Sequence, residues 1–293
     1  MRRNDRVRRS GFVTVVCLGA ASLAVGSGAV GPAVSATPVS AAAPAACWDD
    51  VGTDLDGGGP DVVIGLPSYD LPGKPDAGAL VVFSNVAAKG EADPRPPTAR
   101  RAVTADDVPG LAAQTGARFG ATVAVWGDTR DFDDPDDCAD LLVAAPGQTV
   151  AGMAGAGRVV RLKGAPGGIS ELQEVYDEAT LDGTGGAQAG AGFGSALAVD
   201  TLGMVAIGVP GRDHGSLKDA VRIVLLDYSA TAATPVTRVV EQGAPGAGVP
   251  EAGDRFGEVL QVLPSGKGPI LLVGVPHEDV GSKVDAGAVM LLP

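Results

Sequence analysis

Two acidic loops contain the side chains of this sequence that are best suited to binding chemistry. In the first loop, Asp54, Asp56 and Asp61 surround a run of three glycines, residues 57–59. Carboxylate oxygens are ligands that Ca²⁺ prefers, and alternating aspartates around a glycine turn can converge on one ion. The spacing therefore predicts a calcium site; the alternative is a solvated acidic turn without an ion.

The second loop is longer and also rich in acid. It begins at Asp128 and closes at Asp140, with Asp133 inside a run of carboxylates between them. So many negative charges repel one another unless a cation or solvent relieves the repulsion. A second calcium ion is the expectation, an exposed acidic loop is the alternative, and the chain is thus expected to bind one or two ions.

Two cysteines remain once Cys17, which lies in the apolar leader, is set aside. An even number of cysteines in an exported chain favours one disulfide, here between Cys47 and Cys138. The alternative is a lipid attached to Cys47 as the mature N-terminus, but Pro44 stands where a lipidation signal requires a Leu-like residue.

Candidate catalytic residues are few. The chain has two histidines, His214 and His277, and each follows a Gly-x-Pro sequence. An aspartate stands three residues after the proline in three such segments: Asp70, Asp213 and Asp279. Because these positions are equivalent, the aspartates are expected to have a structural role in their loops. Ser195 follows a Phe-Gly pair and lies in no Gly-x-Ser-x-Gly elbow. Zinc-type His or Cys spacing is absent from the sequence, and a carboxylate pair for glycoside cleavage stays open.

The N-terminal segment reads as an export signal. Residues 1–36 hold five arginines, then an apolar run, then the small residues Val34-Ser35-Ala36, which form a candidate cleavage site. A retained membrane anchor is the alternative. We expect a signal peptide over residues 1–36, a flexible linker over 37–46 and a secreted or cell-surface domain over 47–293, with no stable membrane span after cleavage.

Composition narrows the classes of partner. The net charge is −13, and the leader carries five arginines against one aspartate, so the exported part is more acidic still. Such a surface repels phosphate backbones, which excludes nucleic acid as a partner. Hydrophobic residues make up 45% of the chain, which argues against a wholly disordered acidic protein.

A repeat organises these sites. Four apolar segments end in Gly-x-Pro or Ala-x-Pro: residues 61–67, 140–146, 204–210 and 270–276. A second apolar segment follows each at a constant offset: residues 77–83, 156–162, 220–226 and 286–292. A Phe-Gly segment precedes the last three: residues 116–120, 190–194 and 253–257. More polar segments, such as 171–181 and 235–241, could form outer strands. Short β-branched and aliphatic runs between glycine and proline predict strands, so the fold class is all-β.

The joint pattern of Phe-Gly, Gly-x-Pro and the second apolar strand resembles the FG-GAP repeats of integrin α-subunit heads and of many secreted bacterial proteins. The resemblance covers nearly all of residues 48–293 and implies a β-propeller-like array of about four blades, often with calcium in blade loops. Asp54, Asp56 and Asp61 match the family's calcium loop, with Gly58 in place of its middle acid. Trp48-Asp49 leaves a WD-repeat propeller as an alternative.

The ring of blades is expected to be incomplete. Integrin heads have seven repeats and this chain shows four, of which the first lacks a Phe-Gly strand and the last lacks an outer strand. About fourteen strands are therefore expected. Either residues 37–50 complete a blade within one chain, or two chains cover the exposed strand edges; the sequence favours the first route and a monomer.

The function expected from this resemblance is that of a secreted, non-enzymatic, calcium-binding protein for adhesion or recognition of an extracellular protein or glycan ligand. Loops on one face of a propeller are a usual binding place, so the loops after the Gly-x-Pro strands are the expected contact. An extracellular hydrolase with paired carboxylates and a structural component of the cell envelope are the alternatives.

Overall fold

The computed structural model describes residues 62–84, 98–99, 102–126, 139–164, 171–181, 183–200, 203–219, 222–228, 235–243, 249–263 and 268–292. These residues form fourteen β-strands and one short 3₁₀ helix, η1 (Ala105–Asp107), and no α-helix occurs among them. The strands make four separate antiparallel sheets, none of which closes into a barrel. The all-β prediction is confirmed.

Each sheet corresponds to one sequence unit. Sheet 1 contains β1 (Val62–Leu66), β2 (Ala79–Ser84) and β3 (Thr98–Ala99). Sheet 2 contains β4 (Thr122–Trp126), β5 (Asp140–Ala145), β6 (Arg158–Lys163) and β7 (Glu171–Tyr176). Sheet 3 contains β8 (Ala196–Val199), β9 (Met204–Val209), β10 (Arg222–Asp227) and β11 (Val236–Glu241). Sheet 4 contains β12 (Val259–Leu263), β13 (Ile270–Val275) and β14 (Ala288–Leu292).

The strand order inside each sheet follows the chain. The strand after Phe-Gly pairs with the strand that ends in Gly-x-Pro, and the latter pairs with the second apolar strand. The polar segments predicted as outer strands are β7 and β11. Sheets 1 and 4 have three described strands each, which agrees with the expected total of about fourteen.

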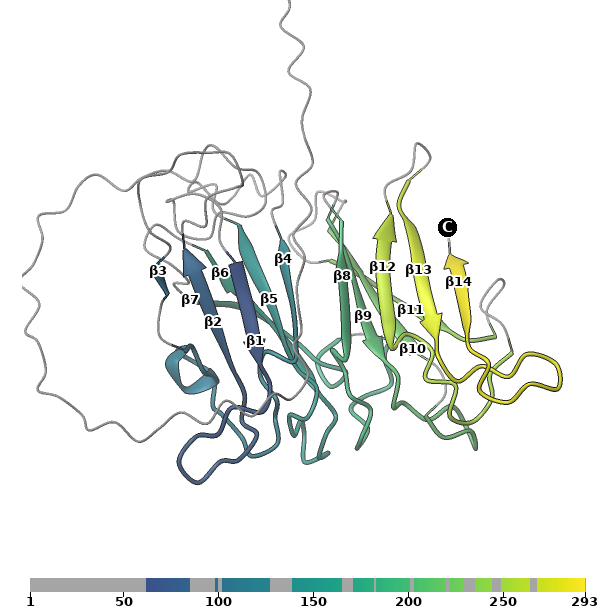
Figure 1. Ribbon diagram of the computed structural model, residues 1–293, viewed down its shortest axis with the longest axis horizontal. Coiled ribbons are helices and arrows are strands. Elements are labelled where there is room, and N and C mark those ends of the chain that lie inside the picture. Colours follow the sequence, from purple (N-terminus) through teal and green to yellow (C-terminus); the bar gives the residue numbers. More distant parts are fainter. Residues whose placement is uncertain are drawn as a thin grey trace, which may run out of the picture.

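The sheets follow one another in chain order, sheets 1 and 2 in the left half of Figure 1 and sheets 3 and 4 in the right half, and we call this series the row of sheets. The core lies between neighbouring sheets. One phenylalanine from each Phe-Gly pair lies in each of the three core layers: Phe119, Phe193 and Phe256. All three are buried, so these rings fill the space between sheets, as expected. Because sheets 2 and 3 are covered on both faces, their central strands are apolar runs and show no polar alternation.

Glycine at two points of the repeat allows neighbouring sheets to approach. A Cβ atom added to Gly65 in β1 would lie 1.9 Å from the carbonyl oxygen of Gly120, which belongs to the next unit. Gly208 in β9 has the same relation to Gly257, at 2.1 Å. In these two units the Gly-x-Pro glycine packs against the Phe-Gly glycine of the next unit, and a side chain at either Gly65 or Gly208 would clash with backbone. In the second unit Ala144 stands at this position, and a Cβ added to Gly194 of the next unit would lie 2.8 Å from the Cβ of Ala144.

Backbone hydrogen bonds repeat across the same boundaries. The N–H groups of Arg118 and Phe119 donate to the carbonyls of Asp76 and Ala77 in the preceding unit, both at 3.0 Å. Equivalent donors in the later units are Gly192 and Phe193, which bond to Gly155 and Ala156, and Arg255, which bonds to Asp219. Each Phe-Gly segment is thus bound to the loop that follows the previous Gly-x-Pro strand.

Candidate functional site

Four equivalent loops lie together along one end of the row of sheets, at the bottom of Figure 1. Each joins a Gly-x-Pro strand to the next strand of its sheet. We call these connections the Gly-x-Pro loops: residues 67–78, 146–157, 210–219 and 276–287. The sequence predicted these loops as the place of ligand contact, and the fold brings all four to a common edge.

A short turn at the tip gives every Gly-x-Pro loop the same shape. Two backbone hydrogen bonds close a four-residue turn in each: Leu71 with Lys74, Val150 with Met153, His214 with Leu217, and Val280 with Lys283. Backbone pairing of this kind fixes the path of the chain whatever the side chains are. The tips therefore share a backbone but carry different side chains.

An aspartate holds the base of three of these loops. Asp70 accepts a hydrogen bond from the backbone N–H of Asp76 at 2.8 Å, and Asp279 accepts one from Asp285 at 2.8 Å. Asp213 does the same for Asp219 at 3.3 Å. The three donor residues have left-handed backbones, with φ of 49°, 51° and 50°, which is strained for a residue with a side chain. The predicted structural role of these loop aspartates is confirmed.

The second Gly-x-Pro loop, residues 146–157, lacks the aspartate and its hydrogen bond. Thr149 stands where the other loops have the accepting aspartate, and Gly155, with φ of 64°, stands at the left-handed position. The backbone N–H of Thr149 donates instead to Oε1 of Gln114 at 3.0 Å. Gln188 accepts from the backbone N–H of Asp213 in the same way at 2.8 Å. Loops two and three are therefore also bound to the segment that leads into the Phe-Gly pair.

The two histidines lie on the surface beside carboxylates. Nδ1 of His214 is 3.4 Å from Oε2 of Glu241, and Nδ1 of His277 is 3.4 Å from Oδ1 of Asp285. The hydroxyl of Ser195 donates to the carbonyl of Gly192 at 2.7 Å and thereby closes the Phe-Gly turn. The Ser195 contact belongs to the Phe-Gly turn, as the sequence predicted, whereas the two histidines stand at different positions of their loops and have unrelated partners.

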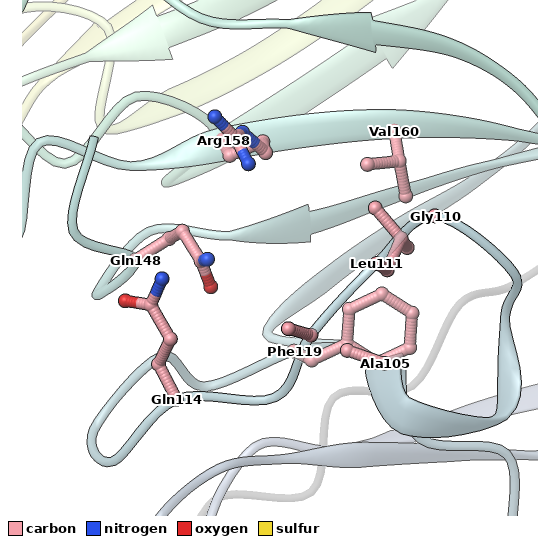
Figure 2. Close-up of a pocket in the computed structure, with 9 residues that line it drawn as sticks. Ala105, Gly110, Leu111, Gln114, Phe119, Gln148, Arg158 and Val160 are labelled. Atoms are coloured by element: carbon pink, nitrogen blue, oxygen red, sulfur yellow. The ribbon is translucent and has the colours of Figure 1, made fainter. Parts of the chain in front are cut away.

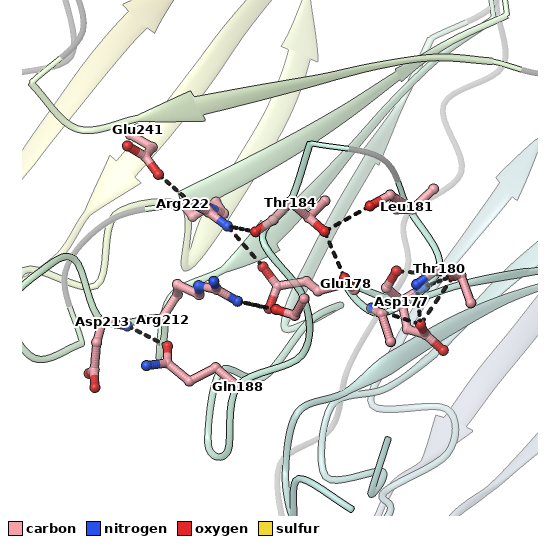
Figure 3. A network of polar contacts seen from close by, with 12 residues as sticks. Asp177, Glu178, Thr180, Leu181, Thr184, Gln188, Arg212, Asp213, Arg222 and Glu241 are labelled. Carbon is pink, nitrogen blue, oxygen red and sulfur yellow. Dashed lines mark hydrogen bonds and ion pairs between the residues drawn. The ribbon is translucent and has the colours of Figure 1, made fainter. Parts of the chain in front are cut away.

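A buried ionic network connects sheet 2 to the third loop (Figure 3). Glu178 follows β7 and is 2% exposed. Nη1 of Arg212 donates to its Oε2 at 2.9 Å, and Nη1 of Arg222 lies 3.3 Å from its Oε1. Arg222 also donates to the carboxylate of Glu241 and to the carbonyl of Thr184. Burial raises the pKa of Glu178 and the two guanidinium groups oppose this shift.

A second polar centre occupies the equivalent place between sheets 3 and 4. Gln242 follows β11 and is 3% exposed. Its Nε2 donates to Asp254 at 2.8 Å and to Glu278, from the fourth loop, at 2.7 Å. Burial, together with the nearby charge of Asp254, raises the pKa of Glu278. Arg212 and Glu278 both stand two residues after the proline of their loops. The same loop position therefore contacts the preceding sheet in both units, through a positively charged side chain in one and an acidic side chain in the other.

Of the predicted calcium ligands, only Asp140 lies within the described residues. It begins β5 and is 3% exposed. Nε of Arg161 donates to its Oδ2 at 2.5 Å, and the N–H of Gly164 donates to Oδ1 at 3.0 Å. Both carboxylate oxygens thus accept hydrogen bonds from protein groups, and the calcium role predicted for Asp140 stays a prediction. The other predicted site residues lie outside the described part of the chain: Asp54, Asp56, Asp61, Asp128, Asp133, Cys47 and Cys138.

Aromatic side chains surround Arg161 near the start of β5, at the end of sheet 2 that lies away from the Gly-x-Pro loops. The guanidinium carbon lies 4.3 Å from the ring centre of Trp126, a cation–π geometry. The Trp126 and Tyr228 rings meet edge to face, with centroids 4.8 Å apart. The hydroxyls of Tyr176 and Tyr228 contact each other and both reach Glu174. Burial raises the pKa of both tyrosines, so both stay neutral.

This aromatic group was not predicted from the sequence. The one available signal is the rarity of aromatic residues, since the chain has only three tyrosines and two tryptophans. Two of the tyrosines and one tryptophan meet in this one place. Nothing in their spacing along the chain indicates that they do so.

A small cavity opens beside the second Gly-x-Pro loop, residues 146–157 (Figure 2). Its volume is about 150 Å³, and Gln114, Gln148 and Arg158 supply its polar groups. Nη2 of Arg158 is bound to Asp177 at 2.8 Å, so its charge is already neutralised. Pockets for drug-sized ligands usually measure about 300–1,000 Å³. The cavity is therefore too small for an extended substrate.

In the part of the chain that the structure describes, no cluster of three or more His, Cys, Asp or Glu side chains is arranged to hold a metal ion. The same residues contain no helix long and apolar enough to cross a membrane. Comparison with models of known protein families finds none that matches this chain, and comparison with curated proteins finds no match either.

Proposed function

We propose that this protein is a secreted, non-enzymatic recognition module of the FG-GAP type, which binds an extracellular protein or glycan through its Gly-x-Pro loops. One observation carries the proposal: four loops with a common backbone lie at one edge of a rigid row of sheets and present different side chains. Function is often placed on loops that a rigid scaffold positions. The arrangement of the four sheets also supports a propeller-like array as the architecture.

The Gly-x-Pro loops offer the chemistry that such contacts need. Tyr69, near the base of the first loop, is 41% exposed, and Met153, in the tip turn of the second, is 43% exposed. His214 and Val280 are exposed in the tip turns of the third and fourth loops. Tyrosine and methionine are enriched at protein interfaces, and an aromatic ring also stacks on sugars. The bases of the loops are fixed by hydrogen bonds, so binding would cost little ordering entropy.

Calcium forms part of the proposal through the first acidic loop. Asp54, Asp56 and Asp61 have the spacing of an oxygen cage, and the support for this site is their sequence pattern. In the second acidic loop, Asp128, Asp133 and Asp140 are the proposed oxygen donors, and the Asp140 carboxylate also accepts a hydrogen bond from Arg161. The proposal is one or two bound ions.

Ligand screening with two matched variants tests the proposal. The purified protein is applied to glycan arrays and to a panel of extracellular proteins, and each hit is repeated with Tyr69→Ala/Met153→Ala. The control is Val236→Ala, which removes a residue of similar exposure from the start of β11, at the opposite end of its sheet.

We expect the loop variant to lose most of the affinity and the control variant to keep it. Equal binding by the two variants would place the ligand elsewhere and contradict the proposal. Release of soluble products from polysaccharide incubated with the protein would instead support the hydrolase alternative.

A further inference from the structure

Sheet 4 carries an apolar face that nothing in the described residues covers. Alternate residues of β12, β13 and β14 point away from sheet 3, and apart from Gln261 and Gly274 they are large and apolar: Val259, Leu263, Ile270, Leu272, Val289 and Leu291. We call this set the forward face of sheet 4. Val289 is 70% exposed, and Val259 and Leu291 are each 60% exposed. An exposed apolar patch formed by one contiguous sheet is typical of an interaction site.

The repeat shows what such a face normally meets. In sheets 1 to 3 the forward face is covered by the sheet that follows, and in sheets 1 and 3 the Gly-x-Pro glycine, Gly65 or Gly208, lies against the next Phe-Gly turn. Gly274 stands at that position in β13, yet the three atoms nearest to a Cβ added there all belong to Val259 of its own sheet. The forward face of sheet 4 therefore resembles the forward faces of sheets 1 to 3, but no following sheet covers it among the described residues.

The fourth Gly-x-Pro loop also lacks the partner that the equivalent loops have. In the earlier loops the carbonyls of Asp76, Gly155 and Asp219 accept hydrogen bonds from the following Phe-Gly segment. Asp285 is the equivalent residue, and no backbone N–H group of the described chain donates to its carbonyl. Val284, beside it, is 74% exposed. Both the apolar surface and the backbone acceptors of an interface are thus present.

Sheet 1 carries the complementary half. Val62, Ile64 and Leu66 of β1, with Val81 and Phe83 of β2, point away from sheet 2 and form its rear face. The equivalent residues of β5, β9 and β13 are buried against the preceding sheet. In sheet 1 they are only partly covered, and Val62 is 37% exposed. The rear face of sheet 1 thus has the chemistry that sheets 2 to 4 present to a forward face.

These two faces lie at opposite ends of the row, so they do not cover each other within one molecule (Figure 1). We propose that the forward face of sheet 4 binds the rear face of sheet 1 of a second copy, as a next sheet would. The contact is head to tail, and such contacts produce closed rings or open filaments. This inference does not depend on the proposed ligand binding, and it replaces the sequence-based expectation of a monomer.

A complementation experiment tests the contact on the purified protein, produced from the full chain. Val289→Lys/Leu291→Lys blocks the forward face of sheet 4, and Val62→Lys/Ile64→Lys blocks the rear face of sheet 1. Val236→Lys, on exposed β11, is the control. Light scattering measures mass as a function of concentration, and thermal melting verifies that every variant is folded.

We expect the wild-type protein and the control to associate and each blocked variant alone to be a monomer. An equimolar mixture of the two blocked variants should form a dimer, because one supplies an intact sheet 4 and the other an intact sheet 1. A monomeric wild type would overturn the proposal and indicate that another segment of the same chain covers the face. Association that survives in the sheet 1 variant would also overturn it, in favour of two sheet 4 faces in contact. If Val62→Lys/Ile64→Lys fails to fold, Val62→Lys alone replaces it.

Discussion

Gly65 and Gly120 are in such close contact that the carbonyl oxygen of Gly120 occupies the place where any side chain of residue 65 would begin. A Cβ atom on Gly65 would lie 1.9 Å from that oxygen. The two glycines belong to neighbouring sheets, so the contact sets the distance between sheets 1 and 2. The same relation between Gly208 and Gly257 sets the distance between sheets 3 and 4.

Gly65→Ala is expected to destabilise the protein by at least about 3 kcal/mol, at the upper end of the range for overpacking, because the clash is with backbone and no rotamer relieves it. Gly73→Ala is the control. It has open space around it and positive φ of 74°, so only a backbone strain of about 1–2 kcal/mol is expected. Urea denaturation of both variants measures the difference, and equal losses would contradict the packing argument.

Removal of Glu178 is expected to be costly. Glu178→Ala leaves Arg212 and Arg222 without their buried carboxylate, and breaking a buried ion pair in this way costs about 3–5 kcal/mol. Glu258→Ala is the matched control, because Glu258 makes an exposed ion pair with Arg255 that is worth about 0–1 kcal/mol. Chemical denaturation at neutral pH compares them. Similar losses in both variants would mean that the network contributes no more than a surface pair.

The pH dependence of stability is expected to change in Glu278→Gln. Burial and the charge of Asp254 raise the pKa of Glu278 above its ordinary 4.5 in the folded state. A carboxyl with a raised pKa favours folding below the unfolded-state value, and this contribution is lost as the pH rises through the folded-state pKa. The glutamine variant should therefore melt higher than wild type at pH 7 and equally at pH 4. Melting curves across this range, with Glu258→Gln as a surface control, test the sign; a lower melting temperature of Glu278→Gln at pH 7 would contradict it.

Calcium is expected to raise the melting temperature through the first acidic loop. An ion that binds only the folded state stabilises it by mass action, and Asp56→Ala should remove most of the gain. Asp76→Asn removes one carboxylate from a Gly-x-Pro loop and tolerates the left-handed backbone there, so it serves as the control. Identical melting curves of the wild-type protein in calcium and in chelator would exclude the site.

The two cysteines of the exported part are expected to be bonded. A bridge between Cys47 and Cys138 would close a loop of about 90 residues and stabilise the fold by roughly 4 kcal/mol in the chain-entropy account. Thiol labelling of the denatured, unreduced protein after leader removal should find no free cysteine, and labelling after reduction should find two. Two labelled cysteines before reduction would show that both thiols are free.

Local sequence patterns were sufficient to predict the strands and the turns between them. Apolar runs bounded by glycine and proline predict strands wherever they stand, because strand formation and turn chemistry depend on neighbouring residues. The repeat therefore predicted the order of strands in each sheet, the interior place of Phe119, Phe193 and Phe256, and the structural role of Asp70, Asp213 and Asp279. Each of these follows from a pattern that recurs at a constant offset.

Contacts between side chains that are distant in the sequence depend on how the sheets pack, and no local pattern predicts them. Glu178 contacts Arg212 and Arg222 because sheets 2 and 3 stack, and Asp140 is bound to Arg161 across a strand pair. Tyr176 and Tyr228 come from different sheets. The open row, with an exposed face on sheet 4 and a partly covered face on sheet 1, is likewise a tertiary property. Whether repeated sheets close into a ring depends on small angles between neighbours, and side-chain packing across each boundary sets those angles, which no repeat motif encodes.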